Sequence, residues 1–342
     1  MTQLARLDAI AQAELCARGE VSAAELWAEC LERIALLNPL LRAVVTQASA
    51  SACGLFGFKP SRGRTVVANR SGSEFANMTS DHCLSRSVRD SALFLSLTED
   101  RSLRAPVGFV RDPSDKRLRI GAWTTTMVGD APEPGVLRAH EEVCALLSDL
   151  GHHVESILAP RYEMPALNEA YYLIAGAAVA NVVETIDRTR GEPVQSAELE
   201  PFTWSLVDAL AECPREPVPD SLAVFARAVS TYNELTRPFD VILTPTVGVE
   251  SVPLGYLSPI LPRQTLLQRA ARVLGYTPVH NIAGCPAMSV PLHWSEAGLP
   301  IGAHFAAAPG QDALLLALAY ELERAQPWQH RWPPYSIPML RG

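Results

Sequence analysis

The stretch Leu118-Arg-Ile-Gly-Ala-Trp123 decides the fold class, because it begins a strand, helix and strand pattern. It predicts a buried strand. Residues 136–150 follow with an apolar helical pattern that Gly151 ends, and His153-Val-Glu-Ser-Ile157 predicts the next strand. A β-α-β unit places its two strands parallel in one sheet and covers them with a helix. We therefore expect an α/β fold in which a mixed β-sheet is flanked by helices.

Apolar segments nearer the C-terminus add strands to this sheet. Phe239-Asp-Val-Ile-Leu-Thr-Pro245 predicts a buried strand that ends at a proline. Ala287–Pro291 and Pro300–Phe305 predict a strand pair joined around Gly298. The last helix is expected over Asp312–Glu323, with its first residue as the cap. The second half of the chain therefore continues the same sheet.

The N-terminal part is expected to be helical. Residues 2–45 predict two helices: Gly19 can end the first in a left-handed cap, and Ser22 with Glu25 forms a capping box for the second. Residues 187–222 are richer in proline and glutamate and predict a looser connection. No clear boundary follows from this stretch, so we expect a single domain over residues 1–342.

The composition excludes several classes of protein. The net charge is −8 and no basic cluster stands out, which argues against a nucleic-acid or anionic-membrane surface. The longest strongly apolar run, Tyr171–Ala180, is too short to span a bilayer. The first residues do not have the pattern of a signal peptide. Seven cysteines form no Cys-x-x-Cys pair, which fits a reducing cytoplasm.

Several blocks of sequence occur in an order that is typical of one enzyme family. They cover almost the whole chain: Leu31–Pro39, Ala50–Arg64, Leu84–Asp90, Phe239–Thr246, Asn281–Ala287, Gly298–Gly302 and Pro309–Trp328. Together they resemble the amidase signature family of amide hydrolases. Within that family they are most similar to bacterial amidases of broad or amino-acid-oligomer specificity. The resemblance implies that family's α/β fold.

The resemblance also implies a catalytic mechanism based on two serines and a lysine. One serine attacks the amide carbonyl, a second on a cis peptide relays its proton, and a lysine kept neutral by burial is the base. Counting back from Cys53, Val45 occupies the nucleophile's position, and the relay serine and the lysine have no counterpart. We therefore expect the family fold to be internally truncated near residues 46–50, with no catalytic residue in the chain.

The lysine content supports this expectation without an alignment. Lysine and arginine together number 29, and only Lys59 and Lys116 are lysines, which leaves 27 arginines (29 − 2). Lys59 lies in a Gly-Phe-Lys-Pro turn after the nucleophile position, and Lys116 lies in a polar loop where water keeps it charged. We expect neither to be a buried base.

Two other patterns contain residues that can do chemistry, and each has a simpler interpretation. His140-Glu141 with Cys144 partly resembles a zinc motif but lacks its second histidine, so we expect a surface or half-buried helix face. Cys285, between glycine and proline and near His280, could be a nucleophile with its base. A cysteine is more often a small buried hydrophobe, and the family resemblance explains this turn without chemistry.

Three short patterns are interpreted as structural. Ser80-Asp81-His82 holds triad residue types, but triads are spatial and no Gly-x-Ser-x-Gly elbow is present. The pair His152-His153 is expected to be solvated at a helix-to-strand turn. Gly54-x-x-Gly57 is too short for a phosphate loop. No metal or cofactor is therefore expected.

Substrate contacts are predicted only in one loop. In the family, the loop that corresponds to residues 71–82 helps to wall the substrate cleft, which makes Asn77, Met78 and Thr79 the candidates for cleft lining. A plain surface loop is the alternative. The expected partner is a small amide if the chain is active, with no nucleic acid and no membrane.

Three hypotheses for function stay open at this point. The chain is a non-catalytic remnant of the family, a pseudoenzyme that is inactive alone. Alternatively, it is an amidase completed by another chain or by a substitute nucleophile. In the third hypothesis it is a binding or scaffold subunit. An internally truncated sheet exposes edges and apolar faces, so we also expect low stability, a homo-oligomer or a complementing chain.

Overall fold

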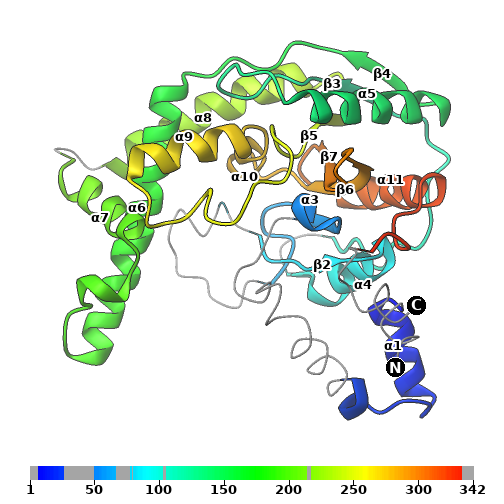
Figure 1. Cartoon of the computed structure of the whole chain (residues 1–342), viewed down its shortest axis with the longest axis horizontal. Coiled ribbons are helices and arrows are strands. Elements are labelled where there is room, and N and C mark those ends of the chain that lie inside the picture. The colour runs from blue at the N-terminus through cyan, green and yellow to red at the C-terminus, as the bar shows by residue number, and fades with distance from the viewer. Residues whose placement is uncertain are drawn as a thin grey trace.

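A computed structural model describes residues 7–26, 50–66, 78, 80–102, 105–213 and 217–332. Its centre is a seven-stranded sheet with the order β2-β1-β6-β7-β5-β3-β4 (Figure 1). Strands β3, β4 and β5 are parallel to one another, and the other pairs are antiparallel. The strands are β1 (Phe56–Lys59), β2 (Leu84–Ser85), β3 (Arg119–Ala122), β4 (His153–Ser156), β5 (Val241–Pro245), β6 (Ala287–Trp294) and β7 (Pro300–Ala307). The sheet is mixed and flanked by helices, which confirms the expected fold class.

Helices account for most of the remaining described chain. They are α1 (Ala9–Ala17), α3 (Ala50–Cys53), α4 (Val88–Thr98), α5 (Pro134–Asp149), α6 (Met164–Arg190), η3 (Ser196–Glu198), α7 (Pro201–Ala211), α8 (Pro217–Thr236), α9 (Arg263–Val273), α10 (Pro278–Ile282) and α11 (Asp312–Ala325). Figure 1 shows α6 and α7 extending together away from the sheet. The β3-α5-β4 unit confirms the pattern that decided the fold class.

One face of the sheet carries the large apolar side chains. The residues of this face occupy alternate positions on β1, β3, β5, β6 and β7, as the pleat requires. They include Phe58, Met288, Phe305 and Leu243, which are in register across four strands. Side chains of α4, α5 and α11 complete this cluster. The main hydrophobic core therefore lies on this face.

The opposite face is small and polar at its centre. Gly57, Ser289, His304 and Thr244 lie in register on β1, β6, β7 and β5. Because these side chains are short, other segments approach the sheet closely. A Cβ atom added at Gly57 would lie 2.6 Å from the Cβ atom of Ala50, so α3 rests directly on β1. We call this surface the polar face.

The segment expected to be loose, residues 187–222, contains regular structure. It holds η3, α7 and the beginning of α8. The prediction was wrong because prolines in this stretch begin helices: Pro201 and Pro217 are each a first helical residue, where a missing N–H costs nothing. The single-domain prediction for residues 1–342 stays a prediction.

The role expected for Asp312 also needs correction. The N-cap of α11 is Gln311. The Asp312 carboxylate is fully buried and accepts hydrogen bonds from the backbone N–H and the hydroxyl of Ser61, at 2.7 and 2.6 Å. The Arg64 Nε atom lies 3.4 Å from the same carboxylate. Asp312 therefore joins the beginning of α11 to the segment after β1.

Helix α6 is longer than the apolar run that the sequence analysis considered. Over Met164–Arg190 it is long and apolar enough, by length and composition, to cross a membrane. In this fold its buried residues Leu167 and Ile174 pack in a cluster with α8. A Cβ atom at Gly176 would lie 2.5 Å from the Leu206 carbonyl oxygen of α7. The helix thus forms the common packing surface for α7 and α8.

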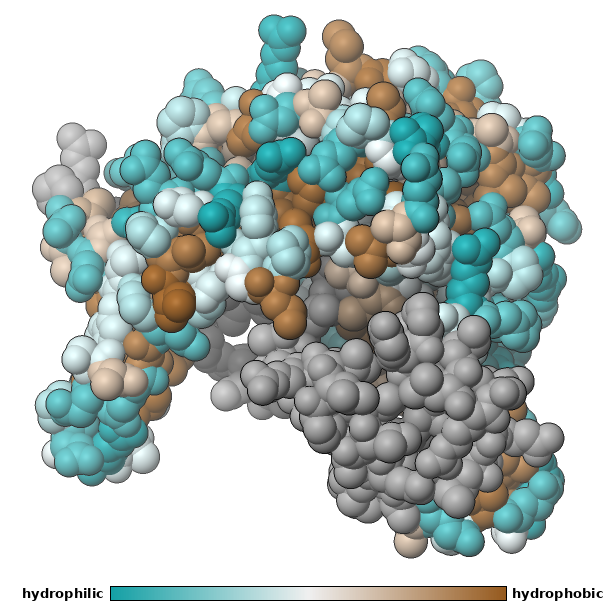
Figure 2. Space-filling model, viewed as in Figure 1, coloured by the Kyte–Doolittle hydropathy of each residue, from teal (hydrophilic) through white to brown (hydrophobic). Residues whose placement is uncertain are grey.

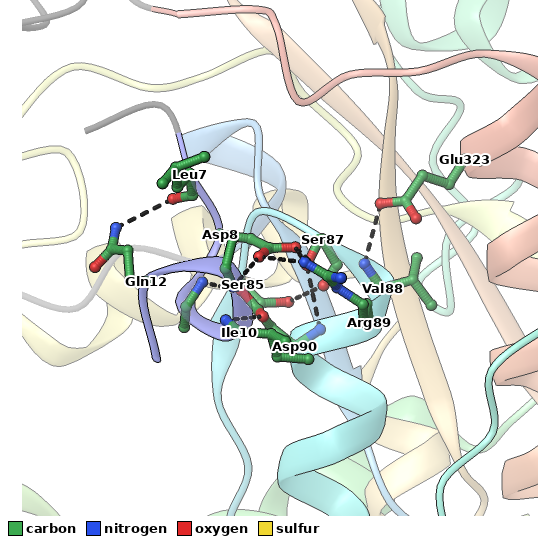
Figure 3. A network of polar contacts seen from close by, with 12 residues as sticks. Leu7, Asp8, Ile10, Gln12, Ser85, Ser87, Val88, Arg89, Asp90 and Glu323 are labelled. Carbon is green, nitrogen blue, oxygen red and sulfur yellow. Dashed lines mark hydrogen bonds and ion pairs between the residues drawn. The ribbon is translucent and has the colours of Figure 1, made fainter. Parts of the chain in front are cut away.

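Helix α1 is attached through polar contacts (Figure 3). Asp8 is its N-cap and also binds Arg89, with the closest N–O distance 2.7 Å. Asp90 in the first turn of α4 accepts hydrogen bonds from Ala9 N–H and Ile10 N–H, at 2.8 and 3.0 Å. The expected cap at Gly19 and the capping box at Ser22 are confirmed. Residues 27–49, which include Val45 and most of the junction near 46–50, lie outside the described part.

Hydrophobic side chains are also found on the surface. Figure 2 shows them at several separate places on this face, among mostly hydrophilic residues. Leu254 and Ile260, in the loop that precedes α9, are 88% and 73% exposed. Single exposed apolar residues are common, so this pattern does not test the expectation of a destabilised fold.

Candidate active site

The centre of the candidate site is a group of three hydroxyls around Gly302 of β7. The Ser51 Oγ atom of α3 accepts a hydrogen bond from the Gly302 N–H at 2.9 Å. The Thr246 and Ser289 hydroxyls are 2.9 Å apart. A Cβ atom at Gly302 would lie 2.5 Å from Ser289 Oγ and 2.9 Å from both other oxygens. Glycine is therefore needed here so that α3, β6 and the residue that follows β5 can bring their hydroxyls together.

These hydroxyls lack the arrangement of an activated nucleophile. All three residues are buried. Within the described residues, their hydrogen bonds go to one another and to the Gly302 backbone, and none to an imidazole, carboxylate or amine. A serine attacks a carbonyl poorly unless a neighbouring base takes its proton. The group is thus a satisfied polar layer on the sheet.

A pair of buried histidines lies beside this layer. The rings of His280 on α10 and His304 on β7 have centroids 4.7 Å apart. Burial lowers the pKa of His304 to about 3 and holds the pKa of His280 well below its usual value. Both rings are therefore neutral at pH 7. Among the residues that the structure describes, neither ring nitrogen of His280 has a hydrogen-bond partner.

Lys59 is more buried than the sequence analysis expected. Burial lowers its pKa to about 8, against the opposing effects of Cys285 and Asp312. Its Nζ atom donates to the Pro60 carbonyl at 3.0 Å. Lys59 is half-buried, and its ammonium loses more contact with solvent than the sequence analysis expected. Lys116 fits the expectation, because it is exposed and pairs with Asp240 at 2.6 Å.

Cys285 lies at the end of the turn that follows α10. Its side chain is fully buried, and burial raises its pKa to about 11 although Lys59 and Arg62 lower it. It packs in a cluster with Trp123 and Ile242. At neutral pH this cysteine is a thiol, which agrees with its interpretation as a buried hydrophobe.

Arg62 holds the same turn from the segment after β1. Its backbone N–H donates to the Gly284 carbonyl at 3.1 Å. Its guanidinium donates to the carbonyls of Asn281 and Ile282, at 2.9 and 2.6 Å. Gly284 has a φ of 68°, which suits glycine, and its α-carbon faces the Arg62 side chain. The turn is therefore fixed against the sheet.

An apolar cavity lies on the other side of α10. Its volume is about 150 Å³, and its walls come from α6, α9, α10 and the loop after β3. Pro278 and Ile282 are the α10 residues in its wall. His280, between them in sequence, packs instead on His304. Helix α10 thus separates the cavity from the polar face.

One of the three predicted cleft residues can be placed. Met78 is buried in a cluster with Leu167 and Ile282, which both also line the cavity. Asn77 and Thr79 lie outside the described residues. Their role in the cleft, and that of Met78, stays a prediction.

The remaining candidate residues are dispersed. His140 is buried, Glu141 is exposed, and the described part contains no group of three or more His, Cys, Asp or Glu residues that could hold a metal. His82 bonds Ser91 at 2.8 Å and forms no triad with its sequence neighbours.

His152 was expected to be solvated and is buried. Its Nδ1 atom accepts from Leu118 N–H at 3.1 Å, and its Nε2 atom lies 3.1 Å from Glu321. The prediction was wrong for this residue because α11 covers the turn.

The sequence analysis missed the hydroxyl group and the cavity. Thr246 and Ser289 lie within or next to the sequence blocks that resemble the amidase signature family. This position could have identified them as candidate site residues. The cavity wall was visible as a stripe at helical spacing on α6, where Met164, Leu167 and Tyr171 recur. Neither of these sequence patterns indicates which segments of the chain come into contact in the fold.

Comparison with known sequences gives the relationships of the chain. The sequence model of the Amidase family matches residues 48–316. The putative amidase AmiC of Mycobacterium leprae is 34% identical over 282 residues, which is 82% of this chain and 59% of the relative. The 6-aminohexanoate-cyclic-dimer hydrolase of Pseudomonas sp. strain NK87 is 30% identical, covering 84% of this chain and 62% of the relative. The chain thus spans about three fifths of the length of these relatives.

Solved structures agree with the sequence comparison. A 6-aminohexanoate cyclic dimer hydrolase superimposes with a TM-score of 0.73 and 28% identity, covering 84% of this chain and 63% of that protein. A bacterial aryl acylamidase of the amidase signature enzymes has a TM-score of 0.67 at 23% identity, with 86% and 62% covered, which shows the shared fold. Together with the family model, these likenesses establish that the chain belongs to the amidase signature family.

Proposed function

We propose that this chain is the sheet-forming part of an amide hydrolase and that it carries no complete catalytic machinery. The observation that supports this most is the polar face. Its three hydroxyls bond to one another and to backbone, with no base hydrogen-bonded to them among the described residues. Because a serine needs such a base, the chain alone should not hydrolyse amides.

The position of α3 and the length of the chain support the same proposal. The chain matches 59% of the length of the M. leprae relative. Helix α3 begins at Ala50, directly after the junction near residues 46–50 where we place an internal truncation. It is seated on the polar face through Gly57 and Gly302. A catalytic segment joined ahead of α3 would meet the sheet at this face.

A graft tests this proposal. Residues 46–49 are replaced by the segment that precedes the equivalent of Ala50 in AmiC of Mycobacterium tuberculosis, and ammonia release from benzamide and hexanamide is measured. We expect no release from the unaltered chain and release from the hybrid. A hybrid whose grafted nucleophilic serine is changed to alanine is the matched control. Turnover by the unaltered chain that one substitution abolishes would show that the proposal is wrong.

Two alternatives predict different results. If a second polypeptide supplies the catalytic segment, co-expression of that segment in trans should restore hydrolysis. If the chain is a binding or scaffold subunit, neither graft nor co-expression should restore it, while a defined complex should be isolated. A substitute nucleophile at Cys285 is disfavoured, because that thiol is fully buried and its pKa is raised to about 11.

We also propose a cytoplasmic location. The six described cysteines are all unpaired, as in proteins of a reducing compartment. If cell fractionation finds the protein in the membrane or secreted fraction and not in the cytosolic fraction, the proposed location is wrong. Whether the chain forms homo-oligomers can be measured by light scattering.

A further inference from the structure

A hollow lies between the beginnings of α1 and α4 and the C-terminal half of α11. Figure 3 shows three of its wall residues, Asp8, Arg89 and Glu323. Its volume is about 450 Å³, and it shares no wall residue with the apolar cavity beside α10. We call this hollow the arginine pocket. Its charged wall residues are Asp8, Arg86, Arg89, Arg111, Glu323 and Arg324.

The walls of the arginine pocket are positively charged although the protein is acidic. Four arginines and two carboxylates give the pocket a formal charge of +2 (4 − 2), whereas the whole chain carries −8. The arginines come from three separate segments, which are the beginning of α4, the loop before β3, and α11. For this reason no basic cluster stands out in the sequence. A concave surface of one sign raises the local concentration of ions of the opposite sign.

Arg86 is held in the wall without a carboxylate partner. Its guanidinium donates to the carbonyls of Gln329 and Arg331, at 2.6 and 3.2 Å, and lies 3.6 Å from the centre of the Trp332 ring. Burial lowers its pKa, because the charged form is partly removed from water. Within the part of the chain that the structure describes, no ion pair offsets this charge. An anion in the pocket would supply the missing counter-charge.

Arg111 is the second arginine of the pocket without a carboxylate partner. It is exposed, and its guanidinium carbon lies 4.1 Å from the centre of the Phe109 ring. Among the described residues it forms no ion pair. Two uncompensated positive charges therefore remain in the wall. The other two arginines are neutralised, each at an N–O distance of 2.7 Å, by the ion pairs Arg89–Asp8 and Arg324–Asp112.

The Tyr320 hydroxyl senses guanidinium groups from two of these segments. Burial raises the pKa of Tyr320 to about 12, and Glu323 adds to this effect. Arg89 and Arg111 oppose it, so both guanidinium groups lie close enough to act on one hydroxyl. The Glu323 carboxylate accepts a hydrogen bond from Val88 N–H at 3.0 Å, and burial raises its pKa. The carboxylate that opposes the two arginines is therefore already engaged by a backbone donor.

We propose that the arginine pocket binds a small oxyanion with two negative charges, of the kind found in a phosphate group or a dicarboxylate, independently of amide hydrolysis. Two charges match the two arginines that lack a partner. A guanidinium group offers parallel N–H donors that fit the oxygens of a carboxylate or a phosphate. A volume of about 450 Å³ leaves room for such an ion and for bridging waters.

Calorimetry on the unaltered full chain tests the proposal with sulfate, phosphate, succinate and acetate. All are compared at about pH 8, where phosphate is mostly a dianion, and at one ionic strength, because salt screens exposed charges. We expect the dianions to bind and acetate, with one charge, to bind at least about tenfold more weakly. Tighter binding of sulfate and phosphate would identify a phosphate-like ligand, and tighter binding of succinate a dicarboxylate. If no dianion binds, or if acetate binds as tightly as the best dianion, the proposal is wrong.

Arg111→Gln locates the ion. The change removes one unpaired charge from an exposed side chain and should weaken sulfate binding about tenfold, the effect of one lost hydrogen bond to a charged group. Arg161→Gln, at an exposed arginine in the loop after β4, is the matched control and should leave binding unchanged. Equal losses in both variants would show that sulfate responds only to the net charge of the protein, which would refute the site.

Ala11→Glu tests the α1 side of the pocket. Ala11 lines the pocket at the third residue of α1, where a glutamate stabilises the beginning of a helix. The added carboxylate should therefore leave α1 folded and weaken sulfate binding at least about tenfold, because it brings a negative charge into the pocket. Ala13→Glu, at an exposed position of the same helix, is the control.

Undiminished sulfate binding by Ala11→Glu, with an unchanged circular dichroism spectrum, would place the ion elsewhere and overturn the proposal. Failure of the graft described above would leave these results unaffected, since no hydrolysis is measured.

Discussion

The Ser51 hydroxyl accepts a hydrogen bond from the backbone N–H of Gly302 at 2.9 Å, and this bond ties the first turn of α3 to β7. Ser51 and Gly302 are 251 positions apart in the chain. Their contact fixes where α3 packs on the polar face of the sheet. The bond is buried, so either partner left alone would lose a hydrogen bond without gaining one to water.

Gly302→Ala should destabilise the protein by about 1–3 kcal/mol, the usual cost of overpacking. The added Cβ atom would lie 2.5 Å from Ser289 Oγ. Urea unfolding measures the change. Adding Ser289→Ala to this variant removes the closest contact and should recover part of the loss. An unchanged unfolding midpoint in Gly302→Ala would show that α3 is not seated as described.

Asp312→Ala should destabilise the protein by up to about 3–5 kcal/mol, because it removes the nearer of the two buried carboxylates beside Arg64, the other being Glu99 at 3.8 Å. Ser61 also loses both of its hydrogen bonds to that group. Thermal unfolding is the measurement. Asp149→Ala, at an exposed position of α5, is the control and should change stability little.

Stability should fall as the pH decreases from about 6.5 toward 4. Burial lowers the pKa of His82 and of His140 to about 4. In this window the unfolded chain binds protons that the folded chain does not, so each residue contributes a slope of up to about 1.4 kcal/mol per pH unit. Urea midpoints at several pH values measure it.

His140→Leu should reduce this slope, since leucine does not titrate and His140 Nδ1 has no hydrogen-bond partner among the described residues. Parallel pH profiles for the wild type and His140→Leu would contradict the assignment.

Asp90→Ala should release α1 with little effect on the sheet. The carboxylate caps two N–H groups of α1, and a lost cap costs about 1 kcal/mol. Hydrogen exchange should become faster in Ala9–Ala17 and stay unchanged in α11. Asp115→Ala, in an exposed loop, is the matched control.

Cys285 should resist alkylation in the native protein. With a pKa of about 11, only about one thiol in a thousand is ionised at pH 8, and the side chain is fully buried. Iodoacetamide followed by mass mapping should label exposed Cys53 first and Cys285 only after unfolding. Rapid labelling of Cys285 would reopen its interpretation as a nucleophile.

The parts of the fold that were predictable are those fixed by local pattern. Strand β3, helix α5 and strand β4 follow from an apolar period and a terminal glycine, and β6 with β7 follows from two apolar runs around Gly298. The prediction of a loose connection over residues 187–222 was wrong because prolines in this stretch begin helices and do not end them. Composition alone does not separate these two uses of proline.

The candidate site was less predictable because it depends on distant segments. Lys59 is expected in a turn, and its burial comes from segments around Cys285 and Asp312, far along the chain. His152 is covered by Glu321 of α11 for the same reason. The hydroxyls of Ser51, Thr246 and Ser289 lie together because α3 packs on β7, and β7 pairs with both β5 and β6. The sequence gives the residue types. Which side chains are buried and which come together depends on how the strands pair in the folded protein.

The order of strands has a consequence for how the sheet assembles. Its centre is the β6–β7 hairpin, and the outer neighbours β1 and β5 pair with it from distant parts of the chain. A hairpin forms in about 1–10 μs, so it can act as the folding nucleus before the long-range pairs close. A change of chain length ahead of β1 alters only the entropy of one long loop, which varies slowly with length. We therefore expect insertions and deletions near the N-terminal third of the chain to change the rate of this hairpin's formation little.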